Sequence, residues 1–136
     1  MINMKKRIML VILLCSMALN IYGCGEIKSL DQKVGRNNIL EDLNYLDDNG
    51  DKKEWVYVEG KVAKKLDYDY LPENCFMILE AETGWSCCIV VAEDEKIKKY
   101  LENEIGSENI IKLYGKVKEG KSGDKLIYSK EEYLIK

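Results

Sequence analysis

The sequence contains no histidine, and this absence removes several kinds of chemistry at once. Imidazole is the commonest general base, a frequent zinc ligand and the usual activator of serine and cysteine nucleophiles. The lysine- and glycine-rich stretch "KEGKSGDK", residues 118–125, lacks the G-x-x-x-x-G-K-[ST] order of a phosphate loop. No two carboxylates have a spacing that distinguishes them from a solvated surface. The sequence therefore predicts a protein that is not an enzyme and that has no metal site and no cofactor.

Proline and phenylalanine occur once each, and no apolar run reaches membrane-spanning length. A single proline gives no proline-rich linker. The longest apolar run, residues 8–19, is shorter than the roughly 20 residues that a spanning helix needs. The 136 residues, of which 46% are hydrophobic and 33% charged, suit one globular domain with additional segments.

Residues 1–23 have the order of a secretory signal, with basic residues 5–7 followed by the apolar run. The next stretch, "IYGC" at residues 21–24, resembles the bacterial lipobox, whose cysteine takes a diacylglyceryl group before the signal is removed. The resemblance implies lipidation of Cys24. An ordinary signal peptide with an incidental cysteine is the alternative. Because two or more acyl chains hold a protein stably on a bilayer, we expect a lipid-anchored protein at the outer face of the cytoplasmic membrane.

Removal of the signal leaves an acidic chain. The residues that remain include 18 basic and 24 acidic side chains, a formal net charge of −6. Binding to a phosphate backbone without sequence preference depends on positive surface. The charge therefore argues against nucleic acid as a partner, although a local basic patch is compatible with it.

Residues 24–53 are predicted to be a tether that contains one short helix. Apolar residues at helical spacing are Ile39, Leu40, Leu43 and Leu46. Asn37 or Asn38 is the expected N-cap. The stretch "DDNGD", residues 47–51, is expected to end the helix, with Gly50 at a positive φ.

From residue 54 the apolar period changes to two, which is typical of strands. The predicted strands cover residues 55–65, 75–82, 85–91, 111–118 and 126–136. Thr83 and Gly84 are expected to form a two-residue hairpin turn. Between the third and fourth strands a helix is predicted over residues 93–106, with Asp94 as N-cap and Gly106 after its C-terminus.

Three strands, a helix and two more strands make the order of a five-stranded OB-fold, a Greek-key barrel. Gly60 and Gly115 fall in the middle of strands, where a tightly coiled barrel strand bends and a side chain would obstruct. The predicted fold class is therefore mainly β, with an OB-fold barrel over residues 54–136 preceded by a short helix and a lipoprotein signal peptide. A different five-stranded barrel or an open meander is the alternative.

Two strands carry the most specific family signal, "VYVEGKV" at residues 56–62 and "IIKLYGKVKEG" at residues 110–120. With the lipobox, the short helix, the cysteine-containing hairpin and the helix after it, they resemble the tRNA-anti-like family of bacterial OB-fold lipoproteins. The resemblance covers roughly residues 38–136 and the signal. It implies an OB-fold like that of tRNA-anticodon binders, and it implies neither catalytic residues nor tRNA binding.

An OB-fold usually binds its ligand across the second and third strands, between the loops that follow the first and fourth. Aromatic and basic candidates on these loops, on the hairpin and on outward strand positions are Lys64, Lys65, Tyr68, Tyr70, Trp85, Tyr57, Tyr114 and Lys116, with Lys121 and Lys125 on the last loop. Such side chains bind bases, sugars or peptides, yet tyrosine is also common in strands that bind nothing. Two hypotheses follow: a binding module for an envelope protein, peptide or glycan, and a single-strand nucleic-acid binder that uses the same face.

The cysteines that follow Cys24 are predicted to be packing residues, with redox and metal roles as the alternatives. A two-residue hairpin turn would pair Cys75 with Ala92 and leave it about 13 Å from Cys88 along the ladder. That exceeds the roughly 7 Å between Cα atoms that a disulfide allows. Cys87 and Cys88 should face opposite sides of their strand, and the odd number left after lipidation predicts at least one free thiol.

Overall fold

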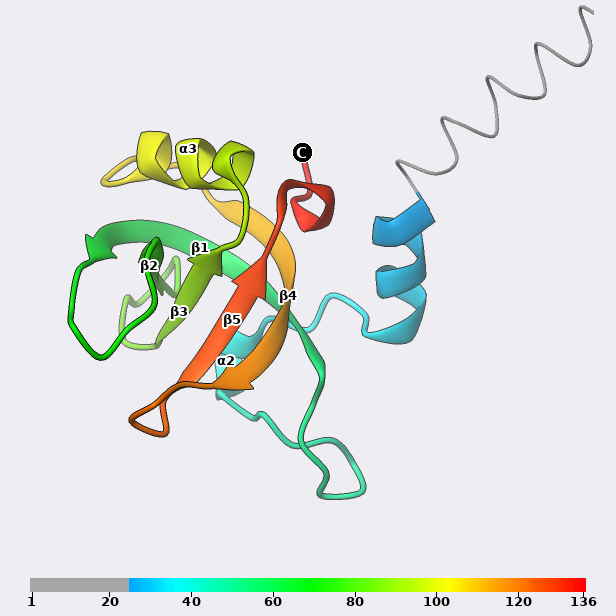
Figure 1. Cartoon of the computed structure of the whole chain (residues 1–136). Helices are drawn as coiled ribbons and strands as arrows, with labels where there is room; N and C mark the ends of the chain where they lie inside the picture. Colours follow the sequence, from blue (N-terminus) through cyan, green and yellow to red (C-terminus); the bar gives the residue numbers. More distant parts are fainter. Residues whose placement is uncertain (1–24) are drawn as a thin grey trace, which may run out of the picture.

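The computed structural model describes residues 25–136, so the predicted signal peptide and Cys24 lie outside the described residues. Five strands close into one barrel in the order β1-β2-β3-β5-β4 (Figure 1). The strands are β1 Trp55–Leu66, β2 Cys75–Leu79, β3 Cys87–Ala92, β4 Ile111–Glu119 and β5 Lys125–Ser129. All neighbours are antiparallel except β3 and β5, which run parallel. With α3, Glu95–Glu104, between β3 and β4, this is the topology of the OB-fold, and the predicted fold class is confirmed.

The long strand β1 closes the barrel because it pairs with two neighbouring strands. Its first half, Trp55 to Gly60, pairs with β4, and its second half, Lys61 to Leu66, pairs with β2. The partner of β1 changes from β4 to β2 just after Gly60, one of the two glycines at which a strand bend was predicted. A register irregularity follows within the β2 ladder, which adds to the coiling that a small barrel needs.

One apolar core fills the barrel, and α3 lies across one end of it (Figure 1). Ile97 and Leu101 of α3 enter this core and have no solvent exposure. The helix begins where predicted, because the Asp94 carboxylate accepts a hydrogen bond from the Ile97 N–H at 2.9 Å. Gly106 after its C-terminus takes the expected positive φ of 74°.

The segment predicted to be a tether packs against the barrel along much of its length. A helix over residues 25–33 places Leu30 against the outside of β1 and β4, and this helix was absent from the sequence prediction. Ile39 and Leu40 lie in the barrel core at 2% and 0% exposure. Residues 25–42 are therefore an integral layer of the domain.

The second helix, α2, is shorter than predicted and covers only Ile39–Asp42. Asn38 caps it as expected, by accepting a hydrogen bond from the Leu40 N–H. Leu43 ends it in the left-handed conformation at φ 50°. Because Leu43 and Leu46 are 42% and 47% exposed, no buried contact would stabilise further helical turns.

The β2–β3 connection is a loop over residues 80–86 and not the predicted two-residue turn. The register differs by one residue as a result, and Leu79 pairs with Cys87 rather than with the cysteine after it. The reason lies in Glu80, whose carboxylate accepts two backbone N–H groups of the loop and stabilises a wider turn. Gly84 still adopts a positive φ, at 68°.

The chain after β5 does not continue as the strand predicted to residue 136. A 3-10 helix, η1 Glu131–Tyr133, follows, and Leu134 then forms an isolated bridge with Leu113. This returns the C-terminus to the edge of β4. Within residues 25–136 no helix has the length and apolar character needed to cross a membrane.

Candidate binding face

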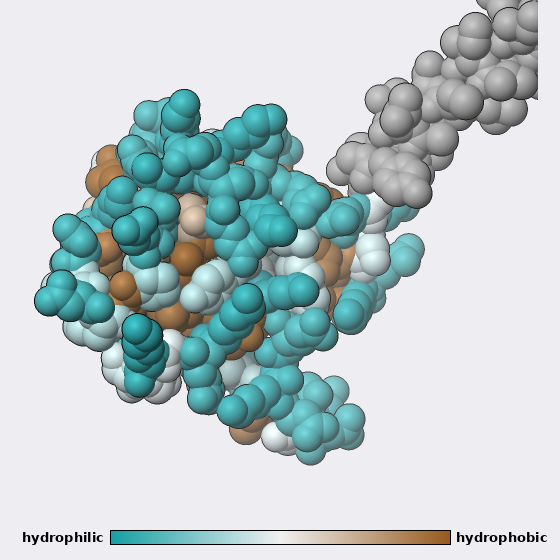
Figure 2. All heavy atoms as spheres, in the orientation of Figure 1, coloured by the Kyte–Doolittle hydropathy of each residue, from teal (hydrophilic) through white to brown (hydrophobic). Residues whose placement is uncertain are grey.

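A second apolar cluster lies outside the barrel, on β2, β3 and β5. It consists of side chains that alternate away from the core, together with residues at the end of β1 and in the β1–β2 loop. Its buried members are Leu66, Cys75, Val91 and Leu126, and its partly exposed members are Leu71, Met77, Ile89 and Tyr128. We call this cluster the outer apolar face. Figure 2 shows apolar atoms gathered over β3 and β5 with hydrophilic atoms around them. An OB-fold presents its usual ligand surface at this place.

The β1–β2 loop, residues 67–74, folds back onto the outer apolar face. Leu71 packs into the cluster, and the Cys75 thiol donates a hydrogen bond to the Pro72 carbonyl at 3.1 Å. Tyr68 and Tyr70 stand out from the loop at 48% and 51% exposure, with their rings stacked 5.5 Å apart. The loop therefore supplies both an apolar border and an exposed aromatic pair.

The charges around the tyrosine pair are mixed. Lys64 and Lys65 are exposed at the end of β1, as predicted, but Lys65 lies 3.7 Å from the Glu102 carboxylate. Acidic residues alternate with the tyrosines in the loop at Asp67 and Asp69. The loop is thus not the continuous basic surface that a phosphate backbone prefers.

Charged side chains beside the second loop that borders the face, between β4 and β5, already have partners within the protein. Glu119 accepts hydrogen bonds from Lys125 at 2.6 Å and from Lys52 at 2.9 Å. These two lysines, Lys125 first, lower the pKa of Glu119 to about 2. The Lys118 ammonium lies 4.6 Å from the centre of the Tyr128 ring. These three cations therefore already have partners, a carboxylate for Lys125 and Lys52 and an aromatic ring for Lys118.

The eight predicted ligand residues lie in three separate places. Lys64, Lys65, Tyr68 and Tyr70 lie beside the outer apolar face; Trp85 is on the β2–β3 loop; Tyr57, Tyr114 and Lys116 are on β1 and β4. Trp85 is 90% exposed and is not a member of any of the apolar clusters of the described residues. The described structure therefore does not bring the predicted residues together into one site.

Two of the predicted ligand residues are not available at the surface. Tyr57 and Tyr114 point out of the barrel, as expected, but they are only 2% and 0% exposed because the helix over residues 25–33 covers them. The prediction that they are exposed is wrong. Burial raises the pKa of Tyr57 to about 12. The Tyr114 hydroxyl donates a hydrogen bond to the carboxylate of Asp31, a residue of the covering helix.

Two of the three described cysteines are buried, as packing residues are, and the third is exposed. Cys75, Cys87 and Cys88 form no disulfide, and Cys87 is exposed while Cys88 is buried, so the two neighbours face opposite sides as predicted. Burial raises the pKa of Cys75 and of Cys88, which disfavours the nucleophilic thiolate. Among the described residues no three acidic or cysteine side chains are arranged to hold a metal ion.

Comparison with known proteins gives no evidence about the function of this chain. No protein-family model matches the chain, and no curated protein is significantly similar to it. Among solved structures, the chain is similar to the structure of RecG bound to a three-way DNA junction, with 18% identity over 56% of this chain and a TM-score of 0.39. The match covers 10% of the RecG chain, and so weak a likeness carries no argument about function. The OB-fold assignment depends on the strand order and on the position of α3 between β3 and β4.

Proposed function

We propose that this protein is a lipid-anchored binding module of the bacterial envelope, which captures a partner protein or peptide through the outer apolar face. The anchor would be a diacylglyceryl group on Cys24, and the module would be displayed at the outer face of the cytoplasmic membrane. The signal-like order of residues 1–23 and the lipobox-like "IYGC" support this part of the proposal. The resemblance to OB-fold lipoproteins of the tRNA-anti-like family agrees with it.

The observation that carries the binding role is the composition of the outer apolar face. Met77, Ile89 and Leu71 are partly exposed there, beside loops whose charges are mixed and partly paired. Protein interfaces combine an apolar centre with a polar border in this way. A peptide or protein surface with apolar side chains would bury Met77 and Ile89 further without leaving charged groups unpaired.

A second candidate is single-strand nucleic-acid binding, and the stacked pair Tyr68 and Tyr70 favours it. Exposed rings provide stacking platforms for bases, and the adjacent Lys64 and Lys65 are cations. The acidic residues within the same loop and the net charge of −6 after signal removal weigh against it. We therefore place the protein or peptide partner first.

The anchor is tested by metabolic labelling with a fatty acid and by membrane fractionation, with Cys24→Ser as the variant and Cys87→Ser as the matched control. We expect label and membrane retention in the native protein and in Cys87→Ser, and loss of both in Cys24→Ser. An unlabelled native protein that fractionates with the cytosol would exclude the lipoprotein assignment.

The binding face is tested by photo-cross-linking in cells. A cross-linking amino acid replaces Met77 on the outer apolar face or, as the control, Lys99 on the exposed side of α3. We expect a discrete adduct from position 77 only, and its loss when Ile89→Glu is added to a protein that still unfolds cooperatively. Equal adducts from both positions, or none from position 77, would contradict the proposed face.

A further inference from the structure

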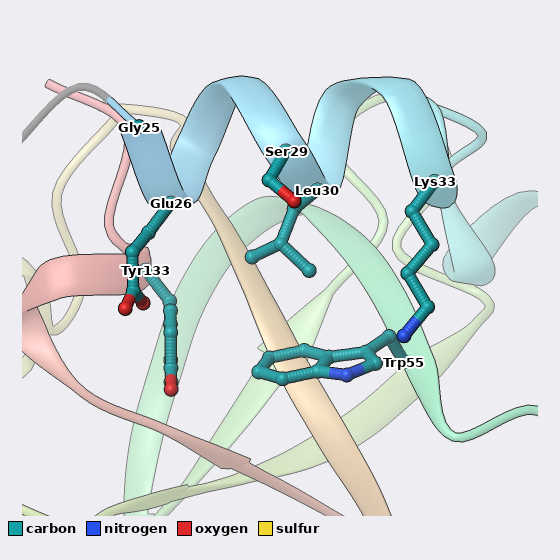
Figure 3. A pocket seen from close by; sticks show the side chains of 7 residues that line it. All are labelled: Gly25, Glu26, Ser29, Leu30, Lys33, Trp55 and Tyr133. Atoms are coloured by element: carbon teal, nitrogen blue, oxygen red, sulfur yellow. The ribbon is translucent and has the colours of Figure 1, made fainter. Parts of the chain in front are cut away.

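A pocket lies between the N-terminal helix, residues 25–33, and the outside of β1. It is a slot of about 500 Å³ between the helix over residues 25–33, which forms its roof, and Trp55, which forms its floor (Figure 3). We propose that this slot binds one sugar ring of a glycan. The inference depends neither on the lipid anchor nor on the outer apolar face.

The floor of the slot is a fixed aromatic surface. The Trp55 and Tyr133 rings pack edge to face, with their centres 4.9 Å apart and an interplanar angle of 83°. The Lys116 ammonium lies 5.1 Å from the centre of the Trp55 ring. Figure 3 shows the indole lying flat beneath the helix, with Leu30 between them. Because these contacts hold the ring in place, a ligand would lose little entropy in ordering it.

The roof carries hydrogen-bonding groups at both ends of the slot. Glu26, Ser29 and Lys33 share one side of the helix, because they are spaced by three and four residues. All three are exposed, and among residues 25–136 none of them takes part in an ion pair. In Figure 3, Glu26 extends toward Tyr133 at one end, and Lys33 extends toward the indole at the other. The slot thus has a carboxylate, a hydroxyl and an ammonium group free for a ligand.

A sugar ring has the matching chemistry. One side of a pyranose is made of C–H bonds that pack on an aromatic ring, and its edge carries hydroxyls that both donate and accept. The slot offers a half-buried indole beside the Leu30 side chain, with polar groups around it, and its volume is within the usual range for small-molecule sites.

Other ligand classes fit the slot less well. A phosphate group would meet the Glu26 carboxylate, and an organic cation would meet the ammonium groups of Lys33 and Lys116. An acyl chain would bury the polar roof without pairing it, which costs free energy. A neutral, hydroxyl-rich ring avoids all three penalties.

The chain has only two tryptophans, which makes a direct test possible. In ¹⁵N-labelled full-length protein, held in a detergent without a sugar headgroup, the two indole N–H signals are assigned with Trp85→Phe. Glucose, N-acetylglucosamine and its trisaccharide are then titrated. We expect a saturable shift of the Trp55 signal with at least one of these sugars. Trp85, at 90% exposure on the β2–β3 loop, is the internal control and should not shift.

Two lysines of the same helix supply the matched variants. Lys33→Met removes a group that lines the slot, whereas Lys28→Met removes an exposed lysine that does not line it. We expect Lys33→Met to weaken sugar binding roughly tenfold, the effect of losing one hydrogen bond to a charged group, and Lys28→Met to leave it unchanged.

Three results would overturn the proposal. The first is a Trp55 signal that no sugar moves, or that moves only together with that of Trp85. The second is equal weakening by Lys33→Met and Lys28→Met. The third is a Trp55 shift produced by anionic lipid vesicles or a single-stranded oligonucleotide but by none of the sugars, which would assign the slot to a different ligand class.

Discussion

At the scale of single residues, the Tyr114 hydroxyl ties the N-terminal helix to the barrel. It is buried and donates to Asp31, which also pairs with Arg36 at 2.9 Å. We expect Tyr114→Phe to lower the free energy of unfolding by about 1 kcal/mol, since a hydrogen bond to a charged acceptor is lost while Asp31 keeps its other partner. Urea unfolding measures the change. Tyr57→Phe is the control and should cost less, because its hydroxyl makes only a 3.4 Å bond to Glu59; an equal loss would contradict the role given to Tyr114.

The same contact predicts a pH dependence. The hydrogen bond from Arg36 and then that from Tyr114 hold the pKa of Asp31 below its ordinary value of 3.8. A carboxyl whose folded pKa is depressed contributes stability above its unfolded pKa and loses it as the pH falls through the lower folded value. We therefore expect the stability difference between the native protein and Asp31→Asn to be constant near neutral pH and to shrink below about pH 3.8. Unfolding curves at a series of pH values measure it, and a difference that grows on acidification would contradict the assignment.

At the scale of secondary-structure elements, two strands depend on glycine for the curvature that closes the barrel. A Cβ on Gly60 would collide with the Leu79 carbonyl oxygen, and one on Gly115 would collide with the Ile127 side chain and lie 2.9 Å from the Tyr128 carbonyl oxygen. Neither backbone oxygen can move without disturbing its ladder. We expect Gly60→Ala and Gly115→Ala each to destabilise the protein by about 3 kcal/mol, as overpacked sites do. Thermal and chemical unfolding measure this, with Gly25→Ala as a control that has open space around it and should change little.

Most of the strands, and the helix α3, could be predicted from the sequence. They were predictable because a strict period of two, a capping aspartate and mid-strand glycines each act locally. The β2–β3 register was not, because it depends on the Glu80 carboxylate, which binds the loop backbone where a tight turn had been expected. The helix over residues 25–33 has few apolar residues, and its stability comes from the β1–β4 surface that it covers. For that reason the burial of Tyr57 and Tyr114, and the slot above Trp55, could not be read from the sequence pattern.

At the scale of the whole molecule, the two function hypotheses differ in what they require of the surface charge. A nucleic-acid binder needs several unpaired cations on one face, since each phosphate contact releases counterions. Here Lys52, Lys61 and Lys125 form short ion pairs with carboxylates at 2.9, 2.7 and 2.6 Å. Exposed pairs of this kind add little stability, but they leave these three lysines already partnered by carboxylates. Our proposal therefore gives the recognition role to the outer apolar face.

We therefore expect the protein to bind a fluorescent single-stranded oligonucleotide only weakly at physiological salt. Tyr68→Ala and Lys64→Ala should change that binding no more than the control Lys99→Ala, which lies on α3 away from the tyrosine pair. Fluorescence anisotropy over a series of salt concentrations measures this. Tight binding with a steep salt dependence, selectively weakened by Tyr68→Ala, would reverse the order of the two hypotheses. The salt dependence would indicate contacts to phosphates, and the loss on removal of the ring would indicate that a base stacks on Tyr68.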